Sequence, residues 1–268
     1  MSANEVKAKG FSYDYEALTY ELVFEDTFEG DTLNLENWGF DVGGSGWGND
    51  ELQYYTEGDN VRVENGQLFI ELRKEDKEDK KYTSSRLVTR NKVDILYGKV
   101  EVRAKLPKGL GTWPAIWMLS TDWEYGKWPA SGELDILEHV GYDQDVIHAS
   151  IHTESYFFKI NTQKQATIPF AGVSEEFHTY FIEWLPDVVH IGVDDTVYQT
   201  YRPTDYLENP TYKEWPFDKR MHLLMNIAYG GNWGGKMGID ESCLPQEMVI
   251  DFVRMYQSPQ LKGLKQNT

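Results

Sequence analysis

The chain has a single cysteine, Cys243, among 268 residues, so no disulfide can form within it. Basic residues are also scarce, because 26 Lys and Arg stand against 44 Asp and Glu, which gives a formal net charge of -18. Such an acidic surface repels phosphate backbones and anionic lipids. We therefore expect neither nucleic acid nor a membrane as a partner.

Long apolar runs are missing as well. No stretch of about 18 apolar residues occurs, so the sequence predicts no transmembrane helix. The segment Met1–Lys9 lacks the basic and apolar regions of a signal peptide. Amphipathic stretches with helical periodicity over ten or more residues are also absent, which argues against a helical fold.

Alternation of apolar and polar residues dominates instead. Residues 99–106 alternate strictly, which predicts a half-buried strand. Residues 61–72 predict a hairpin that turns at Asn65-Gly66, and residues 189–197 predict another at Asp194-Asp195. Many short strands with Gly- and Asn-rich turns indicate an all-β fold, either a sandwich or a barrel.

The sequence predicts one domain, because no linker, repeat or low-complexity tract interrupts it. We predict an extended N-terminal lead-in over residues 1–18, a single domain over residues 19–258 and a loose C-terminal tail over residues 259–268. We expect the protein to be a monomer.

Three carboxylates lie close together in the segment Ser131–Gly141. On a strand, Glu133 and Asp135 point to the same face, but strict alternation turns Glu138 toward the core. An unpaired carboxylate is costly there. A β-bulge near Ile136-Leu137 restores the parity and places all three carboxylates on the open face.

Such a set suits glycoside hydrolysis with retention, which needs two carboxyl groups roughly 5–5.5 Å apart. Glu133 then acts as the nucleophile and Glu138 as the acid/base, while Asp135 between them helps to keep Glu138 protonated. Two other interpretations stay open on these residues alone: an ordinary acidic strand face, and a calcium or magnesium site.

The segment Gly132–Glu138 resembles the E-x-D-x-x-E signature of glycoside hydrolase family 16. Further segments similar to the laminarinases of that family follow in the family's order between about residues 20 and 257: Trp47–Thr56, Tyr82–Arg86, Tyr97–Pro107, Trp113–Leu119, Asn226–Trp233 and Asp251–Tyr256. The extra residue between Asp135 and Glu138 resembles the bulged branch of the family.

The resemblance implies a β-jelly-roll sandwich of two curved antiparallel sheets with a substrate cleft across the concave sheet. It also implies endo-acting hydrolysis of β-1,3-glucan with retention, and mixed-linkage β-1,3-1,4-glucan is a second candidate substrate. By family role, Glu133 is the nucleophile, Glu138 the acid/base and Asp135 the residue that assists the nucleophile. No catalytic cofactor is implied.

Sugar contacts also follow from the resemblance. For any single Trp, the alternative to sugar binding is packing in the core. Of the two histidines that follow the carboxylates, His152 fits the family position better than His148. The alternative for His152 is also structural packing. The residues expected to bind substrate are Asn49, Arg86, Trp113, Trp117, Trp128, His152, Asn226 and Trp233.

A structural calcium is a further expectation from the resemblance, with Asp251, Thr27 and Gly66 as its ligands. Oxygen ligands of this kind suit calcium. Pairing of Asp251 with a nearby Lys or Arg is the alternative.

Three competing functions remain. A non-catalytic glucan-binding protein of the same fold is disfavoured because Glu133 and Glu138 are both present. A transglycosylase needs the same acids, and no motif separates it from a hydrolase. Sulfated substrates such as carrageenan favour a basic cleft, which this acidic chain makes less suitable. Because polymeric glucans do not cross membranes, we expect the protein to be secreted or periplasmic.

Overall fold

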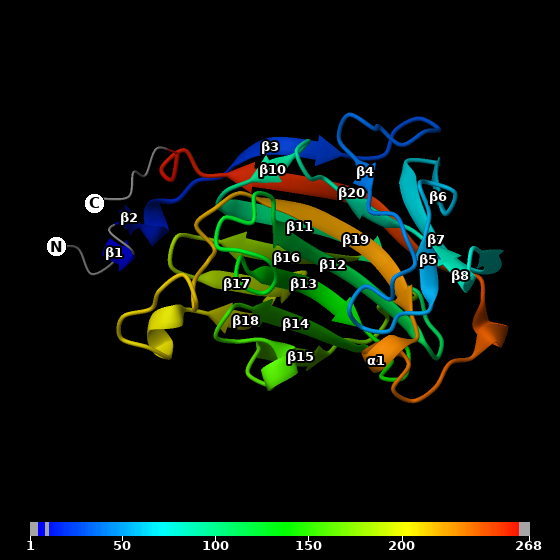
Figure 1. Ribbon diagram of the computed structural model, residues 1–268. Helices are drawn as coiled ribbons and strands as arrows, with labels where there is room; N and C mark the ends of the chain where they lie inside the picture. The colour runs from blue at the N-terminus through cyan, green and yellow to red at the C-terminus, as the bar shows by residue number, and fades with distance from the viewer. Residues whose placement is uncertain (1–4, 9–10, 263–268) are drawn as a thin grey trace.

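The computed structural model of the protein describes residues 5–8 and 11–262. Within these residues, two large sheets pack face to face around one main hydrophobic core (Figure 1). We call them the cleft sheet and the back sheet. This arrangement confirms the predicted all-β sandwich.

The cleft sheet has eight strands, ordered β15-β14-β13-β12-β19-β9-β4, with β10 paired to β19. All of its pairs are antiparallel. Its strands are β4 (Gly39–Phe40), β9 (Arg86–Val88), β10 (Asp94–Ile95), β12 (Thr112–Ser120), β13 (Glu133–His139), β14 (Val146–His152), β15 (Lys164–Pro169) and β19 (Met221–Tyr229).

The back sheet has ten strands, ordered β18-β17-β16-β11-β20-β7-β8-β5, with β3 paired to β20 and β6 to β7. Only the β5–β8 pair is parallel among its described strands. Its strands are β3 (Glu21–Asp26), β5 (Gln53–Tyr55), β6 (Val61–Glu64), β7 (Gln67–Lys77), β8 (Lys80–Ser84), β11 (Gly98–Lys105), β16 (His178–Trp184), β17 (Val189–Val193), β18 (Thr196–Tyr201) and β20 (Gln246–Gln257).

The predicted strands and hairpins are confirmed. Buried and half-buried residues alternate along the whole of β11, because its apolar residues face the core. The β6–β7 hairpin turns at Asn65-Gly66, where both residues have positive φ. The second hairpin joins β17 to β18 at Asp194-Asp195, as expected.

Helical structure is minor in the described residues. Its five elements are η1 (Tyr15–Ala17), η2 (Phe158–Ile160), η3 (Pro203–Asp205), α1 (Gly231–Gly234) and η4 (Glu241–Cys243). None of them is long and apolar enough to span a membrane.

The chain ends are more ordered than the sequence predicts, as far as they are described. β1 (Glu5–Ala8) pairs with β2 (Phe11–Asp14), and buried Tyr13 donates a hydrogen bond to Asp187. At the other end, Leu261 is buried in the main core. Packing of these apolar groups anchors both ends to the domain. The predicted tail from residue 263 onward lies outside the described residues.

Candidate active site

A bulge in β13 turns its three carboxylates to one face. Against β12, Asp135 pairs with Trp117 and Leu137 pairs with Ile116, so Ile136 is the extra residue. The register with β14 shifts at the same place. Leu134, Ile136 and Leu137 are fully buried in the main core. The bulge predicted from the parity of Glu138 is therefore confirmed.

The neighbouring strands divide their side chains in the same way. On β19, Met221, Leu223, Met225 and Ile227 enter the main core. The alternate residue Asn226 lines the opposite, outer face. The cleft therefore lies on the outer face of the cleft sheet.

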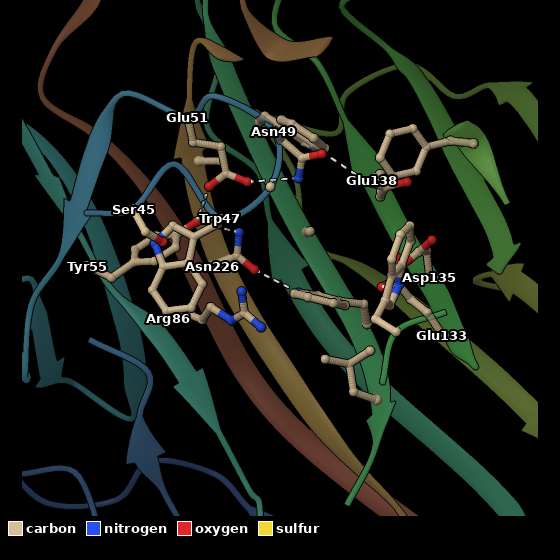
Figure 2. A pocket seen from close by; sticks show the side chains of 18 of the residues that line it. Ser45, Trp47, Asn49, Glu51, Tyr55, Arg86, Glu133, Asp135, Glu138 and Asn226 are labelled. Carbon is tan, nitrogen blue, oxygen red and sulfur yellow. Dashed lines mark hydrogen bonds between the residues drawn. The ribbon is translucent and has the colours of Figure 1, made fainter. Parts of the chain in front are cut away.

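The cleft has a volume of about 390 Å³. Figure 2 shows Glu133, Asp135 and Glu138 on one side, across from Asn49, Glu51, Tyr55 and Arg86. We call these sides the carboxylate wall and the polar wall. The predicted residues that line the cleft are Glu133, Asp135, Glu138, Asn49, Arg86, Trp113, Trp117, Trp128 and Asn226.

Two predicted residues lie next to the cleft lining and are not part of it. His152 is buried, and its Nε2 lies 3.7 Å from Glu133 Oε1 and 3.3 Å from Asp135 Oδ2. Trp233 packs edge-on against Trp113, with ring centres 5.3 Å apart. His148 lies opposite Glu138 on β14, but its ring packs edge-on against Trp233 with ring centres 4.9 Å apart, and among the described residues only His152 forms ion pairs with these carboxylates. His152 is thus the histidine of the carboxylate wall.

Two tryptophans hold the outer carboxylates of this wall. Trp128 Nε1 donates to Glu133 Oε2 at 2.8 Å, and Trp113 Nε1 donates to Glu138 Oε1 at 3.1 Å. Hydrogen bonds to a carboxylate favour its charged form. The indoles therefore fix the orientation of both side chains while their rings border the cleft.

Burial and mutual repulsion raise the pKa of each carboxyl group. Burial and the charge of Asp135 raise the pKa of Glu133 to about 8. Burial raises the pKa of Glu138 to about 7, with a further contribution from Glu133. Burial and Glu138 raise the pKa of Asp135 well above its usual range. The wall therefore retains protons near neutral pH, which a general acid requires.

The polar wall is a chain of hydrogen bonds that starts at Glu51. Its carboxylate accepts from Asn49 Nδ2 at 3.1 Å, from Gln53 Nε2 at 2.7 Å and from the Tyr55 hydroxyl at 3.3 Å. The chain continues because Asn226 Nδ2 donates to the Tyr55 hydroxyl at 3.0 Å. Trp117 Nε1 in turn donates to Asn226 Oδ1 at 2.7 Å. Glu51 thus orients side chains along the whole wall.

Arg86 lies between two aromatic rings of the cleft. Its guanidinium carbon is 4.7 Å from the Trp47 ring centre and 4.6 Å from that of Trp117. Arg86 Nε also lies 3.3 Å from Asp41 Oδ2. The two rings and the Asp41 carboxylate therefore hold the Arg86 guanidinium in place at the cleft.

Several lining residues are missing from the sequence prediction. The signal for two of them was present, because Glu51, Gln53 and Tyr55 alternate along one face of a recognised motif. Phe158 comes from a loop with no such periodic signal. The lining residues not predicted as contacts include Ser45, Trp47, Glu51, Tyr55, Trp123, Phe158 and Lys159.

The strand registers place the three predicted calcium ligands on neighbouring segments, because Val253 of β20 pairs with Asp26 and Ile250 pairs with Leu68. An ideal Cβ on Gly66 would lie 3.9 Å from the Thr27 carbonyl oxygen, so these two backbones are neighbours. Asp251 Oδ2, however, is 2.6 Å from the Arg103 guanidinium. The structure therefore shows the ion pair that was the alternative for Asp251, and a cation beside Arg103 fits this carboxylate poorly.

The carboxylate wall also has the spacing of a metal site, since ligand atoms of Glu133, Asp135 and His152 lie within 4.8 Å of one another. An imidazole and an indole N–H already contact these carboxylates. Calcium and magnesium prefer oxygen ligands. This donor set therefore fits proton transfer better than either hard cation.

Comparison with known proteins gives one consistent family. The model for glycosyl hydrolases family 16 matches residues 48–254. A β-glucanase of Rhodothermus marinus is 47% identical over 245 residues, which cover 89% of this chain and 85% of that protein.

Solved structures agree. The laminarinase from Rhodothermus marinus superposes with a TM-score of 0.87 at 46% identity, covering 90% of this chain and 99% of that one. SCLam, a non-specific endo-β-1,3(4)-glucanase, gives a TM-score of 0.82 at 43% identity and covers 89% and 91% of the two chains. With its bulged carboxylate strand and its open cleft, the chain belongs to glycosyl hydrolases family 16.

Proposed function

We propose that the protein is a retaining endo-β-1,3-glucanase. The observation that supports this most directly is the β13 bulge, which turns Glu133, Asp135 and Glu138 to the same side of the cleft. Retaining glycosidases need two such carboxyl groups on a common substrate-facing surface. The glucan-cleaving activities of the similar proteins point to the same substrate class.

In the first step, a Glu133 oxygen attacks the anomeric carbon of the sugar. The bond from this carbon to the glycosidic oxygen breaks, and Glu138 donates its proton to the departing oxygen. The product is a glycosyl ester on Glu133 and a shortened glucan with a new hydroxyl group.

In the second step, ionised Glu138 removes a proton from water. The water oxygen attacks the anomeric carbon, and the ester bond to Glu133 breaks. The sugar leaves with its original anomeric configuration, and both side chains return to their starting protonation states.

The remaining residues of the wall set these protonation states. The Trp128 N–H favours the ionised form of Glu133, as the nucleophile requires. Asp135 is almost fully buried, and one of its oxygens has no hydrogen-bond partner in the described residues. We assign the proton shared by these two carboxyl groups to Asp135, because a neutral carboxyl tolerates such a site best.

The shape of the cleft supports endo-cleavage. Aromatic rings from separate strands and loops line it, and a polymer can pass across such an open surface. Mixed-linkage β-1,3-1,4-glucan is a second substrate within this proposal, as the non-specific SCLam enzyme suggests. Because the proposed substrate is a polymer outside the cell, we propose that the protein is secreted or periplasmic. We also propose that it acts as a monomer.

The test is product analysis on laminarin, lichenan, cellulose and agarose side by side. We expect short oligosaccharides from laminarin, with cellulose and agarose uncut, and cleavage of lichenan if mixed linkages are accepted. Proton NMR of the first product should show the β-anomer before mutarotation. Binding of laminarin without cleavage of any polymer would contradict the proposal, as would release of the α-anomer.

A further inference from the structure

A short turn at the rim of the cleft carries exposed apolar side chains. η2 connects β14 to β15, and its Phe158 and Ile160 are 41% and 53% exposed. Phe158 also lines the cleft. Exposed apolar side chains that gather beside a binding cleft commonly mark a contact surface for a ligand.

The backbone of this turn is held in place. The Thr162 hydroxyl accepts from Phe157 N–H at 3.1 Å and donates to the Ser155 carbonyl at 3.2 Å. Asn161 N–H closes the turn on the Phe158 carbonyl at 3.0 Å. Little conformational entropy is therefore lost when a ligand contacts the turn.

The turn packs directly on Trp128. Its ring centre lies 5.6 Å from that of Phe157 and 5.5 Å from that of Phe158. Lys159 Nζ lies 5.5 Å from the Trp128 ring centre. Trp128 itself donates to Glu133, so one aromatic surface runs from the nucleophile to the rim.

We propose that Phe158 forms an additional sugar-binding position next to Trp128, where a further glucose unit of the bound glucan packs on the Phe158 ring. The inference rests on the proposed function. The C–H groups on the flat face of a pyranose pack against an aromatic ring by dispersion and weak C–H···π contact. The Lys159 ammonium can donate to the sugar hydroxyls.

A glucan is the occupant because this surface is continuous with the cleft. Phe158 contacts Trp128 and lines the same cavity as the three carboxylates, so a longer glucan bound at Glu133 can extend to it. The position adds affinity for longer chains and adds no new chemistry. Its signature is therefore a dependence on chain length.

The test compares kcat/KM for β-1,3-linked oligosaccharides of increasing length. In the wild type we expect kcat/KM to rise when the chain becomes long enough to reach Phe158. In Phe158→Ala we expect that last increase to shrink about three- to tenfold, the range typical of one aromatic contact. Phe158→Trp should restore it.

Phe158 also contacts His152, with ring centres 5.9 Å apart, so a purely structural effect must be separated. Such an effect would lower kcat/KM by the same factor at every chain length, and this result would overturn the proposal. Equal activity of Phe158→Ala and wild type on all lengths would overturn it as well.

Two further variants complete the design. Ile160→Ala controls for a change in the turn itself, because Ile160 is exposed in the same turn and is not among the cleft-lining residues, and it should match the wild type. Leu35→Ala is the matched control, because Leu35 is 60% exposed and is not among the cleft-lining residues, and it should match the wild type. Failure of the wild type to cleave any β-glucan would instead reject the proposed function, so the two failures are distinguishable.

Discussion

The two walls of the cleft both contain a buried carboxylate, but they pair it differently. On the polar wall, Glu51 accepts hydrogen bonds from Asn49, Gln53 and Tyr55. On the carboxylate wall, Asp135 Oδ2 makes no hydrogen bond among the described residues, and the His152 imidazole lies 3.3 Å from it. Burial raises the pKa of both carboxyl groups, but the donors around Glu51 lower its pKa, whereas the neighbouring Glu138 raises that of Asp135 further. A carboxylate surrounded by donors is suited to hold a surface in shape, while crowded carboxyl groups hold protons that chemistry can use.

Removal of either catalytic carboxyl group should have the largest effect. Glu133→Gln removes the nucleophile and Glu138→Gln removes the acid/base, so each should lower kcat by about a thousandfold or more. Asp135→Asn keeps both reacting groups and should lower kcat less than either Gln variant does. Turnover of laminarin measures this, with circular dichroism to show that the fold is intact. Near-normal activity of either Gln variant would reject the assigned roles.

The pH profile should show the protonation state of Glu138. Its pKa is raised to about 7, so it is protonated below that pH and loses the proton above it. Only protonated Glu138 donates to the leaving oxygen and only ionised Glu133 attacks, and burial raises the pKa of Glu133 to about 8. We therefore expect kcat/KM to fall about tenfold per pH unit above roughly pH 8. A profile that stays flat to about pH 9 would contradict this role.

Glu51→Gln tests the polar wall. The amide places an NH2 group against the donors of Asn49, Gln53 or Tyr55, so the wall loses its shape while the reacting carboxylates remain. We expect KM to rise about tenfold, with a smaller change in kcat, since buried donors are left unpaired. Exposed Glu57→Gln is the control and should be silent. A loss in kcat alone would instead connect Glu51 to the chemical step.

Replacement of Glu138 should raise the stability of the folded protein although it lowers the activity. The folded pKa of Glu138 is about 7 against an ordinary value of 4.5, so the folded state binds more protons between these pH values. Its stability therefore falls as pH rises from about 4.5 to 7. Glu138→Gln cannot ionise, so its free energy of unfolding at pH 8 should exceed that of the wild type by about 1–3 kcal/mol.

At pH 4 the same variant should be about as stable as the wild type, because Glu138 is then mostly protonated in both the folded and the unfolded state. Thermal melts of the two proteins at pH 4 and pH 8 measure the difference. An equal shift at both pH values would show that packing, and not ionisation, is responsible.

Metal removal should have the smallest effect. The structural calcium at Thr27, Gly66 and Asp251 stays a prediction, and the ion pair of Asp251 with Arg103 argues for a weak site. We expect a chelator to lower Tm by less than about 2 °C and to leave activity at low temperature unchanged. A drop of several degrees that added calcium reverses would show that the ion displaces Arg103.

Much of the carboxylate wall could be predicted from local sequence. Glu133, Asp135 and Glu138 lie within six residues, and the parity of a strand forces a bulge if all three face the cleft. The polar wall was harder to predict because its hydrogen bonds join Glu51 to Asn226 through Tyr55, and Tyr55 and Asn226 are 171 positions apart in the chain. No local pattern specifies such a pairing.

The sequence by itself determined the all-β class, the strands and hairpins that alternate with period two, and the three carboxylates with their bulge. These features depend on neighbours within a few residues, so sequence spacing encodes them. The tertiary structure decided which side chains of distant strands meet: Arg86 between Trp47 and Trp117, Arg103 on Asp251, and Phe158 on Trp128. Those contacts arise only when the two sheets and their loops pack, because packing sets the distances between residues far apart in the chain.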